Sequence, residues 1–497
     1  MRRLASSQLK FYAALRAGFG ARPSSDAVWR VKGKESSGTG LRIAVVQLQL
    51  RGALGHVGLR ASCLAPRAFH QPVLEMRSLG AGGVEMTSTS GVLVRKSEFK
   101  TARRVLFIVE NLPVPFDRRV WSEATTLHAA GYEVSVICPQ RYNYSARYEV
   151  LEGIHIYRHP LPEASRKLGY ILEYASALFW QFVLSVRVYR ERGFDIIHAC
   201  NPPDLIFLVG AFWKFFFGVR FVFDHHDLNP ELFEAKFGRR GFLWILLVWL
   251  ERLTFRIADI SIATNESYRS IAIQRGKMRP ERVFTVRSGP NLSRVKEFPP
   301  DARRKKGRSH LVAYVGVIGE QEGMDLLLAS VDHIVNARDR KDVQFVIMGS
   351  GPSLDATIRQ AKDMGLSEWI EFTGRVDDET LFTVLSTADV CVNPDRPNNM
   401  NDKSTMNKIM EYMALGRPIV QYDLTEGRVS AQNASVYARN TDHKDFGDKV
   451  LDLLDAPELR ARMAAEGRRR VQQELSWPHE APKLLHAYQS LSVLQTQ

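Results

Sequence analysis

The sequence predicts an α/β protein with two Rossmann-like domains, each a doubly wound parallel sheet, that face each other across a cleft. Short apolar runs alternate with helical stretches from residue 104, and the same rhythm restarts after residue 310. Residues 297–310, EFPPDARRKKGRSH, separate the two series and are basic and poor in apolar side chains, as linkers are. Parallel sheets covered by helices on both faces show this alternation, and they bind ligands at the carboxyl ends of their strands.

The first series occupies residues 101–296. A helix is predicted over 121–130, where Gly131 ends it, because glycine adopts the left-handed conformation that closes a helix. The predicted strands are the apolar runs VLFIVE (105–110), VSVICP (134–139), HIYRHP (155–160), DIIHAC (195–200) and RFVFDHHD (220–227).

The second series occupies residues 311–475, with a helix predicted over 324–336. Its strand signatures are LVAYVGVIG (311–319), VQFVIMGSG (343–351), WIEFTGRV (369–376) and DVCVNPD (389–395). The remaining segment, 476–497, begins with SWPHEAPKLLHAYQSL, a last helix that we expect to cross back and brace the first domain.

Residues 404–420, STMNKIMEYMALGRPIV, read as a helix, a turn and a buried strand. Ser404 or Thr405 is expected to cap the helix, Gly416 and Pro418 to end it, and Ile419 and Val420 to begin the strand. Met406, Ile409, Met410 and Met413 recur at helical spacing and should face a core. Glu411 lies in the middle of this helix. A carboxylate at the rim of a cleft suits the two hydroxyls of a ribose, and a solvated helix glutamate is the alternative.

Composition excludes some functions. Of the net charge of +14, residues 1–100 supply +11, from 16 Lys and Arg against 5 Asp and Glu. The remaining chain is close to neutral, so no nucleic-acid partner is predicted. Cys63, Cys138, Cys200 and Cys391 lie far apart without a CxxC pair, which indicates buried thiols in a reducing compartment and no metal site.

Residues 1–100 lack sustained periodicity and are expected to be disordered and without chemistry. Residues 1–25 are basic, contain Ser and are poor in acids, like an organellar presequence. The alternative, which we favour, is that translation starts at Met86, shortly before the first predicted strand.

Five segments in order resemble one family: PVPFDRRVW (113–121), FDHHDLNPELF (223–233), FVIMGSGP (345–352), IEFTGRV (370–376) and EYMALGRPIV (411–420). From about residue 104 to 491 the chain resembles the family 4 retaining glycosyltransferases (glycosyl transferases group 1), which have the GT-B fold. The resemblance implies a nucleotide-sugar donor in the second domain, an acceptor in the first, and no metal or other cofactor.

The resemblance makes Glu411 the ribose ligand, as the second glutamate of the family's Glu–seven residues–Glu motif. A glycine-rich turn after a strand also lets backbone amides approach a pyrophosphate. The predicted donor-binding residues are Glu411, Gly316, Gly319, Gly323, Gly349, Gly351, Gly374, Arg375, Ser404, Thr405, Asn407 and Lys408. A plain turn at 349–352 and solvent-exposed Arg375 and Lys408 are the alternatives.

Three positions depart from the family. Lys403 stands where the first glutamate of the motif belongs, and the neighbouring Asp402 or Asn401 is expected to contact the donor sugar instead. Val317 and Glu322 replace the usual diphosphate-binding Arg and Lys. Their task would then fall to the glycines, a helix dipole and Lys408.

In the first domain, the family places a functional histidine at the end of the strand 220–227. We assign it to His226, with His225 second, and Asp224 or Asp227 would orient the ring. The predicted catalytic residues are therefore His226, His225 and Asp402. A metal bound at His-His-Asp lacks a second group of ligands and is not favoured.

Asp117, Arg118 and Arg119 lie where the family has its acceptor loop, and they are the predicted acceptor-binding residues. An arginine there could hold an acceptor phosphate bidentately, and a salt bridge that braces the first helix is equally compatible.

Residues 170–188, 207–219 and 241–253 are strongly apolar and aromatic, but each is too short to span a membrane. They fit helices that cover a parallel sheet, or interfacial helices at a lipid surface. We favour peripheral membrane contact.

These patterns predict a retaining, metal-independent, hexosyltransferase-type enzyme. It would transfer a sugar from a nucleoside diphosphate to a glycan or lipid-linked acceptor in surface polysaccharide synthesis. We expect it in the cytoplasm, at the inner face of the membrane where it contacts lipid. The alternatives are a non-catalytic GT-B scaffold or glycan-binding subunit, and a GT-B nucleotide-sugar epimerase.

Overall fold

The computed structural model describes residues 42–50, 57–65, 75–79, 83–87, 103–161 and 167–493. It separates into two compact units, residues 1–99 and 100–497. In the first, β1 (Arg42–Leu50) pairs antiparallel with β2 (Val57–Ala65), and β3 (Glu75–Leu79) pairs with β4 (Gly83–Thr87). The sequence predicted no regular structure here, but alternating stretches such as RIAVVQLQL favour strands. The predicted presequence, residues 1–25, lies outside the described residues.

The second unit begins with an eight-stranded sheet in the order β12-β11-β10-β9-β5-β6-β8-β7, in which only β7 runs antiparallel to its neighbour among the pairings described. All five predicted strands are present. The strands are β5 (Arg104–Ile108), β6 (Glu133–Pro139), β7 (Tyr148–Leu151), β8 (Ile154–His159), β9 (Ile196–Cys200), β10 (Arg220–His225), β11 (Ile260–Ala263) and β12 (Val283–Thr285).

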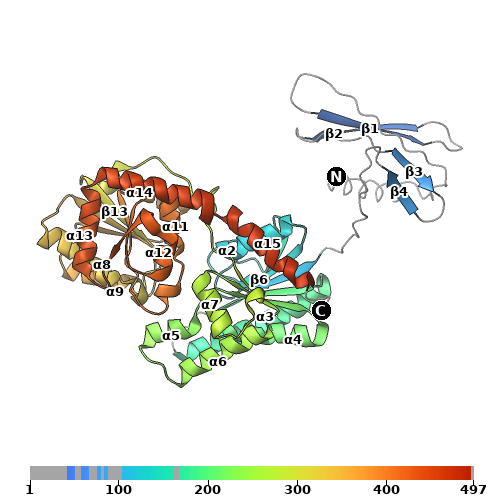
Figure 1. Cartoon of the computed structure of the whole chain (residues 1–497), viewed down its shortest axis with the longest axis horizontal. Coiled ribbons are helices and arrows are strands. Elements are labelled where there is room, and N and C mark those ends of the chain that lie inside the picture. Colours follow the sequence, from blue (N-terminus) through green and yellow to red (C-terminus); the bar gives the residue numbers. More distant parts are fainter. Residues whose placement is uncertain are drawn as a thin grey trace. The chain divides into compact units, whose positions relative to one another are not determined.

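Helices cover both faces of this sheet, as Figure 1 shows. One face packs against α3, α4, α6 and α7, and the other against α2 and the last helix, α15. The bounds are α2 (Arg118–Ala129), α3 (Lys167–Glu191), α4 (Phe207–Phe217), α5 (Asn229–Phe237), α6 (Phe242–Ile257), α7 (Glu266–Gln274) and α15 (Trp477–Val493).

The second sheet has six parallel strands in the order β15-β14-β13-β16-β17-β18. They are β13 (His310–Val315), β14 (Val343–Met348), β15 (Ile370–Gly374), β16 (Val390–Asn393), β17 (Ile419–Tyr422) and β18 (Ser435–Ala438). The helices are α8 (Met324–Asp332), α9 (Leu354–Asp363), α10 (Asp378–Thr387), α11 (Asn407–Ala414), α12 (Thr425–Ala431), α13 (His443–Leu454) and α14 (Pro457–Arg470).

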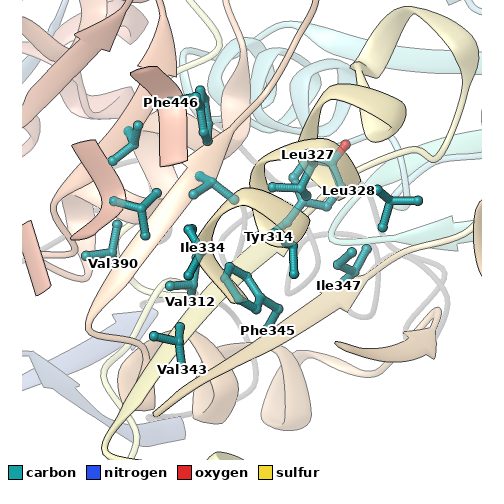
Figure 2. Packing of buried hydrophobic residues seen from close by; sticks show 14 of the residues in the cluster. Val312, Tyr314, Leu327, Leu328, Ile334, Val343, Phe345, Ile347, Val390 and Phe446 are labelled. Carbon is teal, nitrogen blue, oxygen red and sulfur yellow. The ribbon is translucent and has the colours of Figure 1, made fainter. Parts of the chain in front are cut away.

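The core of this domain lies between the sheet and the helices α8 and α13. Figure 2 shows Val312, Phe345 and Ile347 from the central strands beside Leu327 and Ile334 from the segment of α8. The predicted helix 324–336 is α8 followed by a π-helical turn, His333–Ala337. Two parallel sheets with helices on both faces confirm the predicted fold class.

The helix that carries Glu411 starts later than predicted. It begins at Asn407, and Met406 occupies the cap position without a side-chain hydrogen bond, so Ser404 and Thr405 are not its caps. Ile409, Met410 and Met413 are buried as predicted, and Met406 packs against the same core.

The last helix, α15, packs on the first domain. Leu484, Ala487, Tyr488 and Leu491 join the buried cluster that contains α2, and Trp477 Nε1 donates to Thr126 Oγ1 at 2.9 Å. Cys138, Cys200 and Cys391 are buried, as predicted, and burial raises the pKa of each thiol. Among the described residues, no helix is both long and apolar enough to cross a membrane.

Candidate functional site

A buried group of charged side chains surrounds Asp224 at the carboxyl end of β10. Asp224 accepts hydrogen bonds from Arg119, with Nη2 2.8 Å from Oδ1 and Nε 3.2 Å from Oδ2. His226 directs Nε2 at Asp224 Oδ2, and the same nitrogen lies 3.0 Å from Arg119 Nε. Burial alone would raise the pKa of Asp224, but the charges of Arg119 and His226 hold it well below its usual value. Asp224 is therefore the anion that fixes Arg119 and His226.

Glu123 and His198 extend this group into the core. Glu123 Oε1 lies 3.0 Å from Arg119 Nη2, and His198 Nε2 lies 3.3 Å from Asp224 Oδ2. Burial raises the pKa of Glu123 well above its usual value, and burial lowers the pKa of His198. Burial therefore favours the neutral form of each of these two groups, whereas the neighbouring positive charges favour the ionised form of Asp224. His198 Nδ1 lies 2.8 Å from the hydroxyl of Tyr488, which connects α15 to the site.

His226 lies in the turn that follows β10. Asn201 Oδ1 accepts the backbone N–H groups of His226 at 2.7 Å and Asp227 at 3.2 Å, which fixes the turn after β10. The side chain of His226 is 16% exposed. No hydrogen bond joins its Nδ1 to another described residue.

His225 has a different role. It is fully buried among the rings of Phe223, Phe255 and Tyr268, and its Nε2 lies 3.5 Å from Glu251 Oε1. This corrects the prediction that His225 is a candidate for catalysis, because a fully buried ring cannot reach a substrate.

The start of α2 also changes the predicted acceptor set. Asp117 caps the helix, since its carboxylate accepts from the N–H of Val120 at 3.1 Å. Arg119 is buried in its ion pairs, so it does not bind an acceptor, and the salt-bridge alternative holds for this residue. Arg118 alone projects outward, with its side chain 52% exposed.

Arg118 reaches across to Glu411 of the second domain. Glu411 Oε1 accepts from Arg118 Nη1 at 3.0 Å and from Arg294 Nη1 at 3.2 Å. Asp378 completes the network, because it accepts from Arg294 Nε at 2.7 Å. Both arginines use the same oxygen, and no other described residue donates to Glu411 Oε2. Sequence reasoning missed Arg294 and Asp378, which no motif marks.

Arg118 and Arg119 are consecutive, and this brings the two halves of the candidate site together. Arg118 contacts Glu411, and Arg119 contacts His226. Glu411 and His226 therefore lie on either side of one helix start, although 185 residues separate them in the sequence.

Three glycines hold the turns of the second sheet in close contact. A Cβ added at Gly349 would lie 1.8 Å from the carbonyl oxygen of Gly316. A Cβ at Gly351 would lie 2.4 Å from that of Ile318, and one at Gly323 would lie 2.1 Å from that of Pro394. Only glycine fits at these positions, so the turns after β13 and β14 approach each other at the carboxyl edge of the sheet. The predicted Gly316, Gly319, Gly323, Gly349 and Gly351 are thus brought together.

Lys408 lies beside this group of turns. Its Nζ is 2.9 Å from Asp395 Oδ1, 3.4 Å from the hydroxyl of Tyr314, and 3.4 Å from where a Cβ on Gly316 would lie. Asp395 is 1% exposed, and its Oδ2 has no hydrogen-bond partner among the described residues. A cation therefore stands at the glycine-rich turn, although the usual Arg and Lys are absent.

Glu322 faces the same turn. Its Oε2 lies 2.7 Å from where a Cβ on Gly319 would be, and this buried oxygen has no hydrogen-bond partner among the described residues. Burial, and next the charge of Asp395, raise the pKa of Glu322 to about 7, and Lys408 opposes them.

The loop before α11 is held by its own polar side chains. Asn401, which is buried, donates to the carbonyls of Gln321 at 2.9 Å and Arg396 at 2.8 Å. Asp402 accepts from the N–H of Thr425 at 2.8 Å and from its hydroxyl at 3.0 Å, and Lys403 Nζ donates to the Asn399 carbonyl. Asp402 thus caps the start of α12, which argues against the catalytic role predicted for it.

Ser404 and Thr405 contact the first domain. Asn265, the cap of α7, donates to Thr405 Oγ1 at 3.0 Å and to the Lys403 carbonyl at 2.8 Å, and the hydroxyl of Tyr268 lies 3.3 Å from Ser404 Oγ. Asn407, the first residue of α11, is exposed. The loop is therefore fixed from both domains.

Arg375 is held between two rings of the first domain. Its guanidinium carbon lies 4.4 Å from the ring centre of Phe116 and 4.5 Å from that of Tyr142. Such cation–π contacts contribute about 0.5–2 kcal/mol each. The preceding Gly374 has φ of +65°, which orients the turn after β15. Phe116 and Tyr142 were not predicted, because their partner is distant in sequence.

Two groups of possible metal ligands occur in the described part of the chain, and Asp224 belongs to both. The first also contains His198 and Cys200, and the second also contains Glu123 and His226. Arg119 already lies against Asp224 and Glu123. A cation would have to displace this guanidinium, so the donor set does not fit a metal well.

Comparison with known proteins identifies both halves of the chain. Residues 117–289 match the model of the glycosyl transferase 4-like domain, and residues 309–456 match that of glycosyl transferases group 1, together more than half of the chain. A phosphatidyl-myo-inositol mannosyltransferase of Mycolicibacterium smegmatis is 28% identical over 389 residues, which is 77% of this chain and 92% of that protein.

Solved structures with the same fold include sucrose-phosphate synthase from Thermosynechococcus elongatus, with a TM-score of 0.65 at 18% identity, over 79% of this chain and all of that one. Anabaena HepE, solved in complex with UDP-glucose, has a TM-score of 0.58 at 14% identity, over 78% of this chain and 99% of that one.

Proposed function

The chain belongs to the group 1 glycosyltransferases and has their GT-B fold, and we propose that its donor is a nucleoside diphosphate sugar. The transfer would retain the anomeric configuration and need no metal. One observation carries this proposal: Glu411 and His226, the residues that the family resemblance implies, each contact one of two consecutive arginines, Arg118 and Arg119. The UDP-glucose complex of HepE, which shares the fold, also supports such a donor.

In this proposal the ribose hydroxyls bind Glu411 through the free Oε2, and the diphosphate lies against the glycine-rich turns. Lys408, one helical turn before Glu411, supplies the cation at the diphosphate, and Arg118 and Arg294 add positive charge beside Glu411. The nucleobase of the donor would contact backbone groups near Gly374 and Arg375, at the other end of the site.

The transferred sugar lies next to His226. The bond from its anomeric carbon to the diphosphate breaks as the acceptor oxygen bonds to the same face, and the acceptor proton passes to the leaving diphosphate. No enzymatic nucleophile is required, because the diphosphate offsets the charge that develops on the sugar. The protein contributes position and electrostatics. Asp224 and Arg119 hold His226 in place for this step.

We propose a glycan or lipid-linked acceptor bound by the first domain, with Arg118 as the remaining candidate contact from the predicted set. The mannosyltransferase relative named above acts on phosphatidyl-myo-inositol, which supports a lipid acceptor. Surface polysaccharide assembly in the cytoplasm is the setting that suits such an acceptor.

A non-catalytic GT-B scaffold is the second candidate, because Lys403 donates to the Asn399 carbonyl, and Glu322 places a carboxyl at the donor turn where the family resemblance implies a lysine. An epimerase would need several carboxylates around the sugar, and the sequence does not supply them there.

The test is a thermal-shift screen of the protein with UDP, GDP and ADP sugars in the absence of added metal. A ligand at 100 times its dissociation constant should stabilise the native state by about 2.7 kcal/mol. Glu411→Gln should weaken binding roughly 10- to 100-fold, because charge-assisted hydrogen bonds contribute about 1.5–3 kcal/mol.

The matched control is Glu458→Gln on the exposed start of α14, which should bind like the wild type. If no nucleotide sugar shifts the melting temperature, the scaffold is favoured over the transferase.

A further inference from the structure

Three helices of the first domain expose large apolar side chains on their outer surface. Among the described residues, 18 large hydrophobic side chains are exposed, and 12 of them lie between residues 179 and 249, so they are concentrated in one region. We define the aromatic face as the exposed apolar residues of α3, α4 and α6: Phe179, Val183, Leu208, Phe215, Phe216, Phe217, Phe242, Leu243, Ile245, Leu246 and Trp249.

These helices lie together on one side of the sheet. Leu184 of α3, Trp213 of α4 and Phe255 of α6 belong to the same buried cluster, and Figure 1 shows the three helices along one flank of the first domain. The rings of Phe182 and Phe212 pack 4.9 Å apart between α3 and α4. Lys214 of α4 donates to the Ile257 carbonyl at the end of α6 at 2.7 Å. Their exposed residues therefore lie on the same flank of the domain.

A helix that only covers a sheet needs one apolar stripe, which faces inward. α6 has this inner stripe, with Val248 and Phe255 buried, yet Phe242 is 78% and Trp249 55% exposed on its outer side. On α4, Phe215 and Phe216 are 72% and 75% exposed. Apolar patches of this kind on a soluble protein mark interaction sites.

The charges around the aromatic face are basic. Arg187, Arg190, Arg252 and Arg256 are exposed on α3 and α6. Arg239 and Arg240 precede α6, and Arg240 pairs with Glu234 of α5 at 2.9 Å. Among the described side chains of α3, α4 and α6, the exposed acid is Glu191, which pairs with Arg187 at 2.7 Å. Glu251 is fully buried.

We propose that the aromatic face docks on an anionic lipid surface. Apolar and aromatic side chains would enter the boundary between headgroups and acyl chains, while the arginines meet lipid phosphates. A second copy of the chain fits less well, because a symmetric contact would bring the same arginines face to face. The proposal is independent of the donor and of catalysis.

A groove of about 540 Å³ on α3 lies on the same flank. It is lined by Phe182, Val183 and Val186, together with Arg190 and the ion pair of Arg187 and Glu191. An apolar groove beside arginines suits one acyl chain and its headgroup, so it would hold a lipid of the surface to which the protein docks.

The test is flotation of the full-length protein with vesicles of phosphatidylcholine and phosphatidylglycerol in equal parts, compared with phosphatidylcholine alone. We expect binding to the anionic vesicles. Replacing both Phe215 and Phe216 with Ser should lower the partition coefficient roughly 100-fold or more, because two large apolar side chains would no longer enter the acyl region. Phe242→Ser combined with Trp249→Ser should do the same.

The matched control replaces Ile358 and Val429, which are exposed on the second domain, with Ser and should bind like the wild type. Brominated lipids should quench tryptophan fluorescence, and Trp249→Phe should reduce the quenching while keeping the binding. All variants should melt at the wild-type temperature.

Two results would overturn the proposal. Salt-sensitive binding without quenching, unchanged in the aromatic variants, would assign vesicle binding to the basic residues 1–100. A dimer that dissociates in the aromatic variants, while vesicle binding stays constant, would assign the face to a second copy of the chain.

Discussion

Asp224→Asn should lower the free energy of unfolding by about 3–5 kcal/mol, because it leaves the buried Arg119 without its main counter-ion. Asp224 is fully buried, and Arg119 donates to both of its oxygens. His226 loses the same partner, so transfer activity should fall together with stability. Urea unfolding followed by tryptophan fluorescence measures the first effect, and product formation by the folded variant measures the second.

Glu123→Gln is the matched control, since Glu123 lies against the same guanidinium. Burial raises the pKa of Glu123, so folding favours its protonated form, whereas the same carboxyl in the unfolded chain is ionised at pH 7. A raised pKa contributes stability at low pH that is lost as the pH rises. Glutamine needs no proton, so Glu123→Gln should leave stability at pH 7 unchanged or higher. Equal losses in the two variants would contradict the assignment of the charge to Asp224.

The pH dependence of Asp224 has the opposite sign. Its pKa is depressed in the folded protein, so its contribution is present at neutral pH and is lost as the pH falls below its usual value near 4 towards the folded value. The wild type should therefore lose stability in acid more steeply than Asp224→Asn does.

The fold was predictable because its signals are local. Strands such as β6 and β14 are continuous apolar runs, and Gly416, with φ of +60°, ends the segment of α11 before the strand that begins at Ile419. Helix starts were less certain. Ser404 looked like a cap, but its hydroxyl bonds to the Met400 carbonyl at 2.8 Å, so α11 begins three residues later.

The candidate site was predictable only where a residue has a local or family signal. Glu411 and His226 stand in recognisable segments. Arg118 and Glu411 are 293 positions apart, and no sequence motif near either residue indicates that the two are in contact. Arg118 and Arg119 are adjacent residues of the same type, but α2 directs Arg119 into the core and Arg118 outward. An exposed arginine can contact an acceptor, whereas a buried arginine forms a structural ion pair, and the sequence does not show which of the two is buried.

The departures at Val317 and Glu322 acquire different meanings in the structure. The side chain of Val317 is exposed, and the residue contributes to the turn through its carbonyl, which accepts from the Tyr314 hydroxyl at 2.9 Å. Glu322 points at the turn where the diphosphate of the proposed donor would lie, close to Asp395 and Lys408. A carboxylate there would repel a phosphate, whereas a protonated carboxyl could donate a hydrogen bond to it. Donor binding should therefore depend on the proton of Glu322.

With a pKa of about 7 for Glu322, the affinity for a nucleoside diphosphate sugar should be constant below pH 7 and fall about tenfold per pH unit above it. Glu322→Gln should remove this dependence. Glu322→Lys restores the usual cation and changes the local charge by two, so at pH 8 it should bind roughly 100-fold more tightly than the wild type, about 2.7 kcal/mol. Calorimetry with the intact sugar nucleotide is the measurement, because its diphosphate does not titrate near neutral pH.

Glu320→Gln is the control, since Glu320 lies in the same turn but is exposed, and it should keep the wild-type pH profile. The same proton affects folding, because the raised pKa of Glu322 contributes stability below its usual pKa near 4.5. This stability is lost as the pH rises towards 7. Glu322→Gln should therefore also flatten the decline of stability with pH. If the stability profile flattens but donor affinity does not respond, Glu322 is buried beside the turn without meeting phosphate. If both respond, the turn binds the diphosphate, and this chain uses a protonated carboxyl at the position where the family resemblance implies a cation.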